Sequence, residues 1–223
     1  MFWQEDSKKQ HFTLPDTIQD AVFNIHSKVL PIDHSFLLSQ ALLNHLPWLE
    51  EVNAGVHSIG VHDGNGWKQD HKNGLYYPSR RSKLVIRMPK ENLIEANKLV
   101  GKTLDLGKYK IDIVKALKPK LLSSMQVVFA KAVACDQNTD EDDFLQTSYN
   151  QLKDLGIQPK KMLAGLESSI KTDTASLHAR SLMVADLTKQ ESVKLQEHGI
   201  GKHRLLGCGL FIPHKDIESA DES

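Results

Sequence analysis

The pattern of apolar and polar positions divides the first half of the chain into alternating strands and helices. Apolar residues recur three and four apart between Leu38 and Leu46, which predicts a helix. Asp33 is placed to cap this helix and Pro47 to end it. The other expected elements are strands at 16–26, 52–61 and 83–88, a polar loop at 63–78, a helix at 89–100, and one or two strands within 102–117. The predicted order is β-α-β-β-α-β.

The same order returns in the second half of the chain, after a break at 118–120. The expected elements are strands at 121–134, 162–171, 176–187 and 210–213, and helices at 141–155 and 189–198. Two β-α-β-β-α-β units predict an α+β protein with tandem ferredoxin-like, RRM-like domains. Their predicted bounds are 16–118 and 121–215, followed by an acidic tail at 216–223.

Charge is segregated along a chain of 223 residues whose formal net charge is zero. Residues 66–90 are rich in Lys and Arg, whereas residues 136–143 and the C-terminal end are acidic, so any nucleic-acid surface must be a local one. The RNA-recognition module stacks bases on aromatic side chains of its sheet, and no aromatic pair of that kind is evident in the sequence. Recognition through backbone and loops is therefore expected.

Cysteine usage and hydropathy bear on the compartment. Two cysteines, Cys135 and Cys208, are too few for a disulfide framework, and no Cys/His spacing resembles a zinc site. No stretch approaches the roughly 18 apolar residues that a membrane span requires. A reducing cytoplasm is the expected compartment, with no membrane partner, no metal and no cofactor.

Near the C-terminus, two Gly-x-Gly pairs enclose a basic stretch of five residues. The notable residues of this run are Gly199, Gly201, Lys202, His203, Arg204, Gly207 and Gly209. Such glycines let the backbone approach a ligand closely, as in loops that grip phosphate. A dinucleotide fingerprint requires glycine where Arg204 stands, and a Walker A loop requires Ser or Thr where His203 stands. The remaining ligands are a nucleic-acid backbone and an anionic small molecule. The alternative is a glycine-rich hairpin before the last strand.

Three segments resemble the CRISPR-associated repeat-specific endoribonucleases of the RAMP superfamily. The glycine loop, residues 199–209, has the family's two Gly-x-Gly pairs around a basic insert, and residues 208–215 are similar to its Myxan-subtype branch. The second segment is 30–34, in which the first helix opens with His34, and the third is the basic run 80–87. Together these segments span most of the chain.

The resemblance implies an endoribonuclease that cuts CRISPR precursor RNA within its repeats without a metal ion. The ribose 2′-hydroxyl attacks the adjacent phosphate and leaves a 2′,3′-cyclic phosphate. His34 is the expected catalytic residue, with His26 and Lys28 as alternatives, because an ordinary histidine pKa of about 6.5 suits proton transfer near neutral pH. The resemblance also implies retention of the mature guide RNA and, as further partners, other CRISPR-associated subunits of an interference complex.

Cations on the chain predict where the RNA backbone binds. Arg81, Lys83 and Arg87 alternate along one expected strand and so share a face, as a phosphate track requires. In the glycine loop, Lys202 and Arg204 are the expected contacts, with His203 as a further donor. Two purely structural alternatives stay open. The basic strand is then a solvated sheet face, and His34 is a capped core residue. Two other functions also stay open, a non-catalytic RNA-binding subunit and an enzyme for a small anionic substrate.

Overall fold

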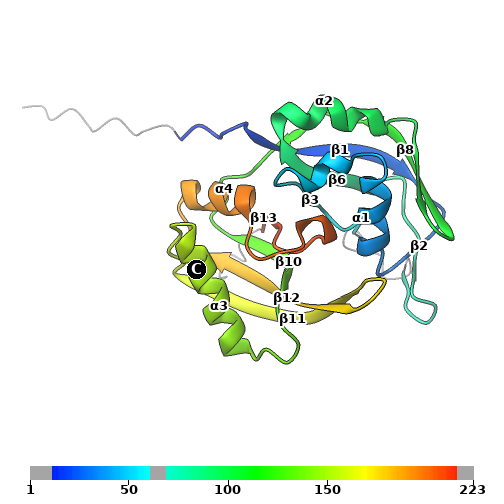
Figure 1. Ribbon diagram of the computed structural model, residues 1–223. Helices are drawn as coiled ribbons and strands as arrows, with labels where there is room; N and C mark the ends of the chain where they lie inside the picture. The colour runs from blue at the N-terminus through cyan, green and yellow to red at the C-terminus, as the bar shows by residue number, and fades with distance from the viewer. Residues whose placement is uncertain (1–11, 61–68, 215–223) are drawn as a thin grey trace, which may run out of the picture.

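The structure is a computed structural model that describes residues 12–60 and 69–214. It is built around two antiparallel sheets, one from each half of the chain (Figure 1). The first sheet has the strand order β3-β6-β1-β8-β7, and β9 also pairs with β1. Its strands are β1 (Ile18–His26), β3 (Gly55–Val56), β6 (Lys83–Pro89), β7 (Thr103–Leu106), β8 (Tyr109–Ala116) and β9 (Lys120–Leu121). A small sheet accompanies it, made of β2 (Leu30–Pro31), β5 (Leu75–Tyr76) and β4 (Gln69–Asp70).

Helices of the first half cover one face of the first sheet. They are α1 (Ser35–Leu43) and α2 (Leu93–Ala96), the latter extended at both ends by 3-10 turns at Lys90–Asn92 and Asn97–Leu99. Alternate residues of β6, including Leu84 and Ile86, share a buried core with Leu38 and Leu42 of α1. This alternation leaves the odd-numbered residues of β6 on the opposite face.

The second sheet has the strand order β11-β12-β10-β13. Its strands are β10 (Val128–Ala134), β11 (Lys161–Lys171), β12 (Ser176–Ala185) and β13 (Phe211–Pro213), and its helices are α3 (Glu141–Asp154) and α4 (Lys189–His198). Local sequence explains where both helices begin. The Asp140 side chain accepts a hydrogen bond from the Asp143 amide at the start of α3, and Thr188 and Glu191 form a reciprocal capping box at the start of α4.

The predicted tandem ferredoxin-like fold is confirmed, and several predicted bounds match closely. The expected helices at 141–155 and 189–198 correspond to α3 and α4, and the segment 102–117 forms two strands, β7 and β8, on either side of Gly107. Lys120 and Leu121 pair with β1, so the first sheet includes residues beyond position 118. The predicted tail at 216–223 lies outside the described residues.

Other predicted elements are shorter or differently held. The strand expected at 52–61 is reduced to β3, and the strand expected at 121–134 is reduced to β10, which begins at Val128. Asp33 does not cap α1, because its Oδ2 accepts a hydrogen bond of 2.8 Å from the backbone N–H of Lys171 in β11. A side chain predicted to act locally therefore links the two halves of the chain.

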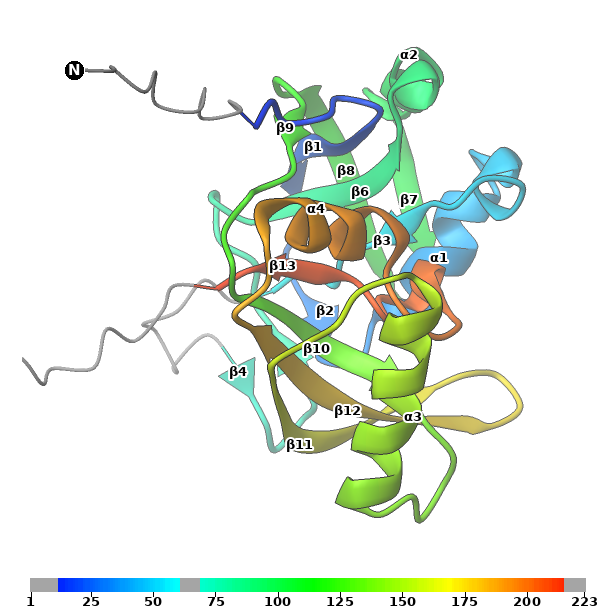
Figure 2. The ribbon, with the colours of Figure 1, turned by 90° about the vertical axis from the view of Figure 1, so that its left-hand side faces the viewer.

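The second half packs against the face of the first sheet that α1 and α2 leave free, and α4 and the edge strand β13 of the second sheet face it (Figure 2). The glycine loop takes part in this packing. Leu205 contacts the core of the first sheet. Leu210, which follows the loop, packs closely on Gly55, so a Cβ added to Gly55 would lie 2.3 Å from the Leu210 Cδ2. Within residues 12–60 and 69–214, no helix combines the length and apolar character needed to cross a membrane.

Candidate functional site

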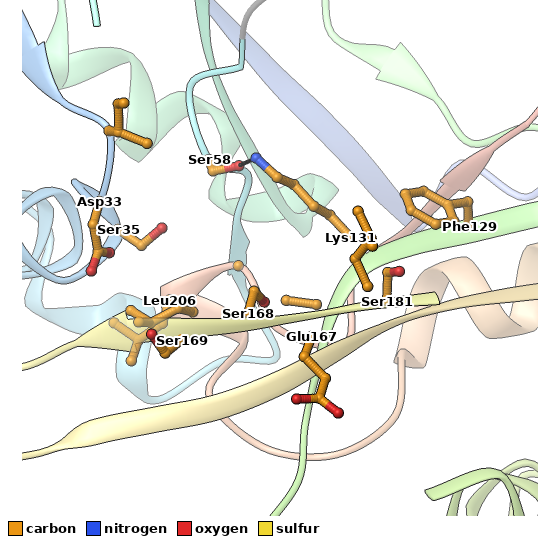
Figure 3. Close-up of a pocket in the computed structure, with 15 residues that line it drawn as sticks. Asp33, Ser35, Ser58, Phe129, Lys131, Glu167, Ser168, Ser169, Ser181 and Leu206 are labelled. Atoms are coloured by element: carbon orange, nitrogen blue, oxygen red, sulfur yellow. Dashed lines mark hydrogen bonds between the residues drawn. The ribbon is translucent and has the colours of Figure 1, made fainter. Parts of the chain in front are cut away.

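A cleft of about 380 Å³ lies between the two halves of the chain (Figure 3). The first half contributes residues around the start of α1 and Ser58, and the second half contributes Phe129 and Lys131 of β10 and Ser181 of β12. Gly207 brings the glycine loop to the same cleft. The Lys131 Nζ lies 3.5 Å from the Ser58 Oγ, at the limit of a hydrogen bond, so this cation spans the cleft. A cavity of this volume is large enough for a small ligand or part of a polymer.

His34 precedes α1 but does not open into this cleft. Its side chain is 3% exposed, and both ring nitrogens are engaged. The backbone N–H of Ile59 donates to Nε2 at 2.9 Å, so Nδ1 carries the proton and donates to the carbonyl oxygen of Pro31 at 3.0 Å. Its sequence neighbours Asp33 and Ser35 do line the cleft. In this structure His34 is a satisfied core residue beside the site.

Burial sets the protonation state of His34. Desolvation lowers the pKa of this histidine, and the charge of Lys131 lowers it further, while the carbonyl of Pro31 and the carboxylate of Asp33 act in the opposite direction. The net shift is downward, so the neutral imidazole is favoured at neutral pH.

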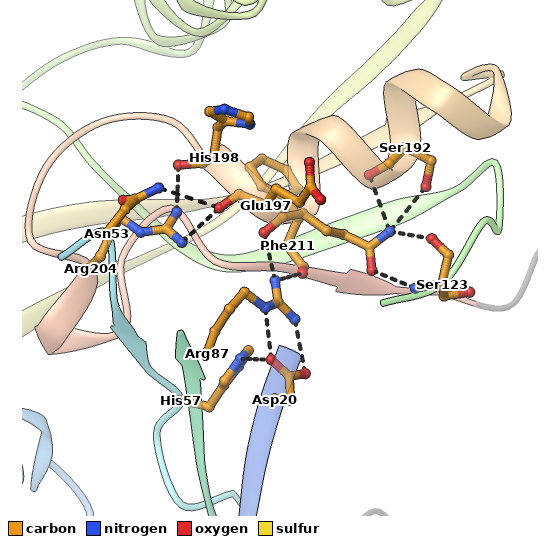
Figure 4. A network of polar contacts seen from close by, with 11 residues as sticks. Asp20, Asn53, His57, Arg87, Ser123, Ser192, Glu197, His198, Arg204 and Phe211 are labelled. Atoms are coloured by element: carbon orange, nitrogen blue, oxygen red, sulfur yellow. Dashed lines mark hydrogen bonds and ion pairs between the residues drawn. The ribbon is translucent and has the colours of Figure 1, made fainter. Parts of the chain in front are cut away.

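The predicted phosphate track is wrong at Arg87. This residue does lie on the face of β6 opposite the core, yet its side chain is 1% exposed because α4 and β13 cover that face. Its guanidinium pairs with Asp20 and donates to the carbonyl oxygens of Gln196 and Phe211 (Figure 4). Arg87 therefore joins the two halves, with four of its five guanidinium N–H groups donating within the protein and its side chain enclosed. Arg81 lies in an exposed turn before β6, and Lys83 donates to the Asn24 side chain.

The outer glycines of the loop are packing positions. Gly199 and Gly209 are buried with positive φ, and a Cβ on Gly209 would lie 1.9 Å from the carbonyl oxygen of Ile200. A Cβ on Gly199 would in turn lie 2.2 Å from the carbonyl oxygen of Gly209. Gly207, with φ of +88°, would meet the carbonyl oxygen of Val56 at 3.3 Å. The two Gly-x-Gly pairs thus allow the loop to fold onto itself. Gly199 and Gly209 are buried in this packing, so the prediction that these two glycines contact RNA is wrong.

Arg204 also has a structural role, contrary to the prediction that it contacts RNA. Its guanidinium donates to the backbone carbonyl oxygens of His198 at 2.5 Å and Glu197 at 3.1 Å, at the C-terminal end of α4. Carbonyl groups at this position have no partner within the helix, and a cation is favoured there by the helix dipole. Burial, together with the charge of Arg87, lowers the pKa of Arg204 to about 10.

Lys202 and His203 are exposed side chains of the glycine loop, and Lys202 is its exposed cation. With Gly201 they line a second pocket, of about 380 Å³, against α3. His203 adopts a left-handed backbone conformation with φ of +66°, which is uncommon for a residue with a side chain. The loop therefore presents Lys202 and His203 on the side of α3 and Gly207 to the cleft.

The alternative catalytic candidates lie elsewhere. His26 and Lys28 are exposed and line a pocket of about 360 Å³ with Tyr109 and Lys110 of β8. Neither residue lines the cleft beside His34. Within the described ranges, no group of three or more His, Cys, Asp or Glu side chains is arranged to hold a metal ion.

Sequence reasoning missed Phe129 and Lys131, although a signal was present. Lys131 is the one charged residue in the apolar run 127–134. A charge within a strand that is otherwise apolar marks a face that is not part of the core. The sequence pattern of this strand could not show that the face meets α1 and the glycine loop, because both come from distant parts of the chain.

Comparisons with known proteins agree on one family. A family model described as Cas6 Crispr matches residues 19–216. A CRISPR-associated endonuclease Cas6 of Myxococcus xanthus (strain DK1622) is 27% identical over 198 residues, which cover 87% of this chain and 80% of that protein.

Solved structures share the fold at low sequence identity. A structure described as CRISPR associated protein Cas6 has a TM-score of 0.62 and 12% identity, covering 89% of this chain and all of the other (100%). One described as an RAMP protein binding different RNA substrates has a TM-score of 0.61 and 13% identity, covering 89% and 100%. A Cas6-related protein of Pyrococcus furiosus has a TM-score of 0.57 and 13% identity, covering 91% and 99%.

Proposed function

The chain belongs to the Cas6 family of CRISPR proteins, and on this premise we propose that it is an endoribonuclease that cuts CRISPR precursor RNA within its repeats. The relative from Myxococcus xanthus is named an endonuclease, which supports an enzymatic role. The observation that carries the proposal is the cleft between the two halves. It brings together the start of α1, the glycine loop and a cation, Lys131, which are the parts needed to bind and polarise a phosphodiester.

The proposed reaction is a transesterification that needs no metal ion. The 2′-oxygen bonds to phosphorus as the bond from phosphorus to the 5′-oxygen breaks, which leaves a 2′,3′-cyclic phosphate. A base accepts the 2′-hydroxyl proton, and the leaving 5′-oxygen takes up a proton. Lys131 is suited to stabilise charge on the phosphate, because its Nζ lies in the cleft.

His34 is proposed as the base, under a stated structural condition. Its neutral form is favoured, as a base requires, but Nε2 accepts the Ile59 N–H in this structure. Proton abstraction by Nε2 therefore requires the backbone at Ile59 to move away when RNA binds. The exposed residues Arg81, Lys202 and His203 and the half-buried Lys83 are proposed to contact the RNA backbone. Retention of the product RNA and association with other CRISPR subunits are part of the same proposal.

A second function is favoured by the burial of His34. Both ring nitrogens of His34 are engaged, and among the described residues no histidine lines the cleft. The alternative is therefore a repeat-RNA-binding subunit that does not cut. The two proposals predict opposite results with the protein's own repeat RNA.

The deciding experiment incubates the purified protein with its repeat RNA in EDTA, beside the same RNA with a 2′-deoxy ribose at the scissile position. We expect cleavage of the first RNA only, with a 2′,3′-cyclic phosphate on the 5′ product. Cleavage that disappears in EDTA contradicts the metal-free reaction. Tight binding of both RNAs without any cleavage supports the non-catalytic subunit instead.

A further inference from the structure

An apolar row crosses the second sheet on the face opposite α3 and α4. The strand register aligns Leu163 of β11 with Met183 of β12, Met183 with Phe129 of β10, and Phe129 with Ile212 of β13. We call these four residues the apolar row. Leu163 is 61% exposed and Ile212 is 42% exposed, while Phe129 and Met183 are half-buried.

The apolar row is not part of the protein core. Its neighbours along β10, Val128 and Ala130, point to the other face and are fully buried in the core with α3 and α4. Large apolar side chains that are aligned on an exposed sheet face mark a binding surface more often than isolated ones do. The row therefore offers a partner a flat apolar surface.

Charge on the same face favours an anionic partner. Lys131 follows Phe129 by two residues on β10 and is exposed, and Figure 3 shows Lys131 and Ser181 on one side of the sheet with Glu167 pointing away. A bulge in β11 between Ala164 and Glu167 changes the register, and Glu167 pairs with Arg180 on the side of α3. The face thus combines apolar side chains with the positive charge of Lys131. The two acidic residues that line the adjoining cleft are already engaged, Glu167 by Arg180 and Asp33 by the backbone N–H of Lys171.

An aromatic ring gives the row the chemistry of base stacking. Phe129 lies on a central strand, and its ring is 6.0 Å from the ring of His214 at the end of β13. Adjacent strands lie about 4.8 Å apart, so the row is about 14 Å across. RNA-recognition modules stack two or three bases on aromatic side chains of a sheet of four strands.

We propose that the apolar row binds unpaired bases of the repeat RNA, with Phe129 as the stacking platform and Lys131 as the partner of an adjacent phosphate. The inference rests on the proposed function, because it takes the repeat RNA as the ligand. Phe129 and Lys131 also line the cleft between the two halves. The row therefore extends the cleft, and RNA that runs across the row enters the cleft at Lys131.

The test measures equilibrium binding of repeat RNA that carries the 2′-deoxy substitution and so stays uncut. Phe129→Leu keeps apolar bulk and removes the ring, and we expect it to weaken binding roughly 5- to 100-fold. Phe129→Trp should restore binding to within about threefold of wild type. Lys131→Gln should weaken binding and reduce the slope of log affinity against log salt by about one. The controls are Ile94→Ser, at an exposed apolar residue of α2, and Lys153→Gln, at an exposed lysine of α3.

The inference and the proposed function fail separately in this design. If the wild type cuts its repeat RNA but Phe129→Leu, folded with an unchanged Tm, binds the uncut RNA as tightly as wild type, the stacking surface is wrong and the nuclease stands. If the wild type does not cut but Phe129→Leu binds weakly and Phe129→Trp normally, the surface stands and the nuclease is wrong. A wild-type dimer that Phe129→Leu converts to a monomer, with RNA affinity unchanged, assigns the row to a second copy and overturns the inference.

Discussion

Arg87 of β6 and Asp20 of β1 form a bidentate ion pair, with 2.8 Å between Nε and Oδ1 and 3.1 Å between Nη2 and Oδ2. The remaining nitrogen, Nη1, donates to the carbonyl oxygens of Phe211 at 2.7 Å and Gln196 at 3.0 Å. His57 lies 3.8 Å from Asp20, beyond hydrogen-bond distance, so Arg87 is the stronger partner of the carboxylate. The buried Arg87 side chain thus pairs with a carboxylate of the first sheet and donates to two backbone carbonyl groups of the second half.

Loss of the Arg87 guanidinium should destabilise the whole chain. Arg87→Met leaves the Asp20 carboxylate and two carbonyl groups without their partner, and we expect the free energy of unfolding to fall by about 3–5 kcal/mol. Denaturant unfolding measures this change. Lys90→Met is the control, because Lys90 forms an exposed ion pair with Asp16. Equal effects of the two variants would contradict the role given to Arg87.

The Asp20 carboxylate should make stability depend on acid pH. Burial acts to raise its pKa, but the contacts with His57 and Arg87 outweigh burial and hold the pKa well below its ordinary value. Because the folded pKa is depressed, the stabilisation is fully present above about pH 4 and is lost as the pH falls further. Unfolding free energy measured between pH 5 and 2 should fall with pH, and Asp20→Asn should flatten that dependence. The exposed Asp173 serves as the control in Asp173→Asn, for which we expect no change in slope.

His34→Gln separates catalysis from structure at the buried histidine. If His34 is the base, cleavage should fall at least 100-fold, while affinity for the uncut 2′-deoxy RNA stays within about threefold of wild type. The measurements are single-turnover cleavage and equilibrium binding. A structural role predicts a lower Tm and weaker RNA binding together, since the Ile59 and Pro31 backbone groups would lose their partner. His45→Gln, an exposed histidine that follows α1, is the matched control.

Gly209→Ala should destabilise the fold more than other substitutions of glycines with positive φ. Its new Cβ would lie 1.9 Å from the carbonyl oxygen of Ile200, so the loop would have to move. Gly101 has a φ of +81° with open space around it, so Gly101→Ala costs only the backbone strain of about 1 kcal/mol. We expect a loss of about 3 kcal/mol or more for Gly209→Ala in thermal or denaturant unfolding. Equal losses would mean that the glycine pairs do not pack as described.

The two basic residues of the glycine loop should respond differently to substitution. Lys202→Gln removes an exposed charge, so RNA affinity and its salt dependence should fall, by about one unit of log–log slope, with an unchanged Tm. Arg204→Gln removes the donor to the Glu197 and His198 carbonyl groups, so the Tm should fall first. A salt-dependence series at each variant and a melting curve distinguish these outcomes. The reverse pattern would contradict the structural role of Arg204.

Much of the fold follows from local pattern. Period-two and helical spacing predicted α3, α4 and the tandem order of strands, because these elements bury one face each and carry their own caps at Asp140 and Thr188. The strand expected at 52–61 failed because only Gly55 and Val56 find a partner strand there, and pairing is decided by β6 and not by the segment itself. The helix expected to be capped by Asp33 and ended by Pro47 spans only Ser35–Leu43, and Asp33 is held by Lys171 of the second half instead.

The sequence by itself determined the family resemblance, the glycine loop and the presence of basic residues at positions 80–87 and 202–204. It could not determine which of these residues reach solvent. Arg87 and Arg204 are used between elements far apart in the chain, His34 is enclosed by Ile59 and Pro31, and Lys131 reaches the cleft from a strand that is otherwise apolar. Whether a charged side chain meets a ligand or a buried carbonyl depends on what packs over it. That packing is a property of the tertiary structure. Every residue has a backbone carbonyl group, so the sequence does not show which of these groups a charged side chain will meet.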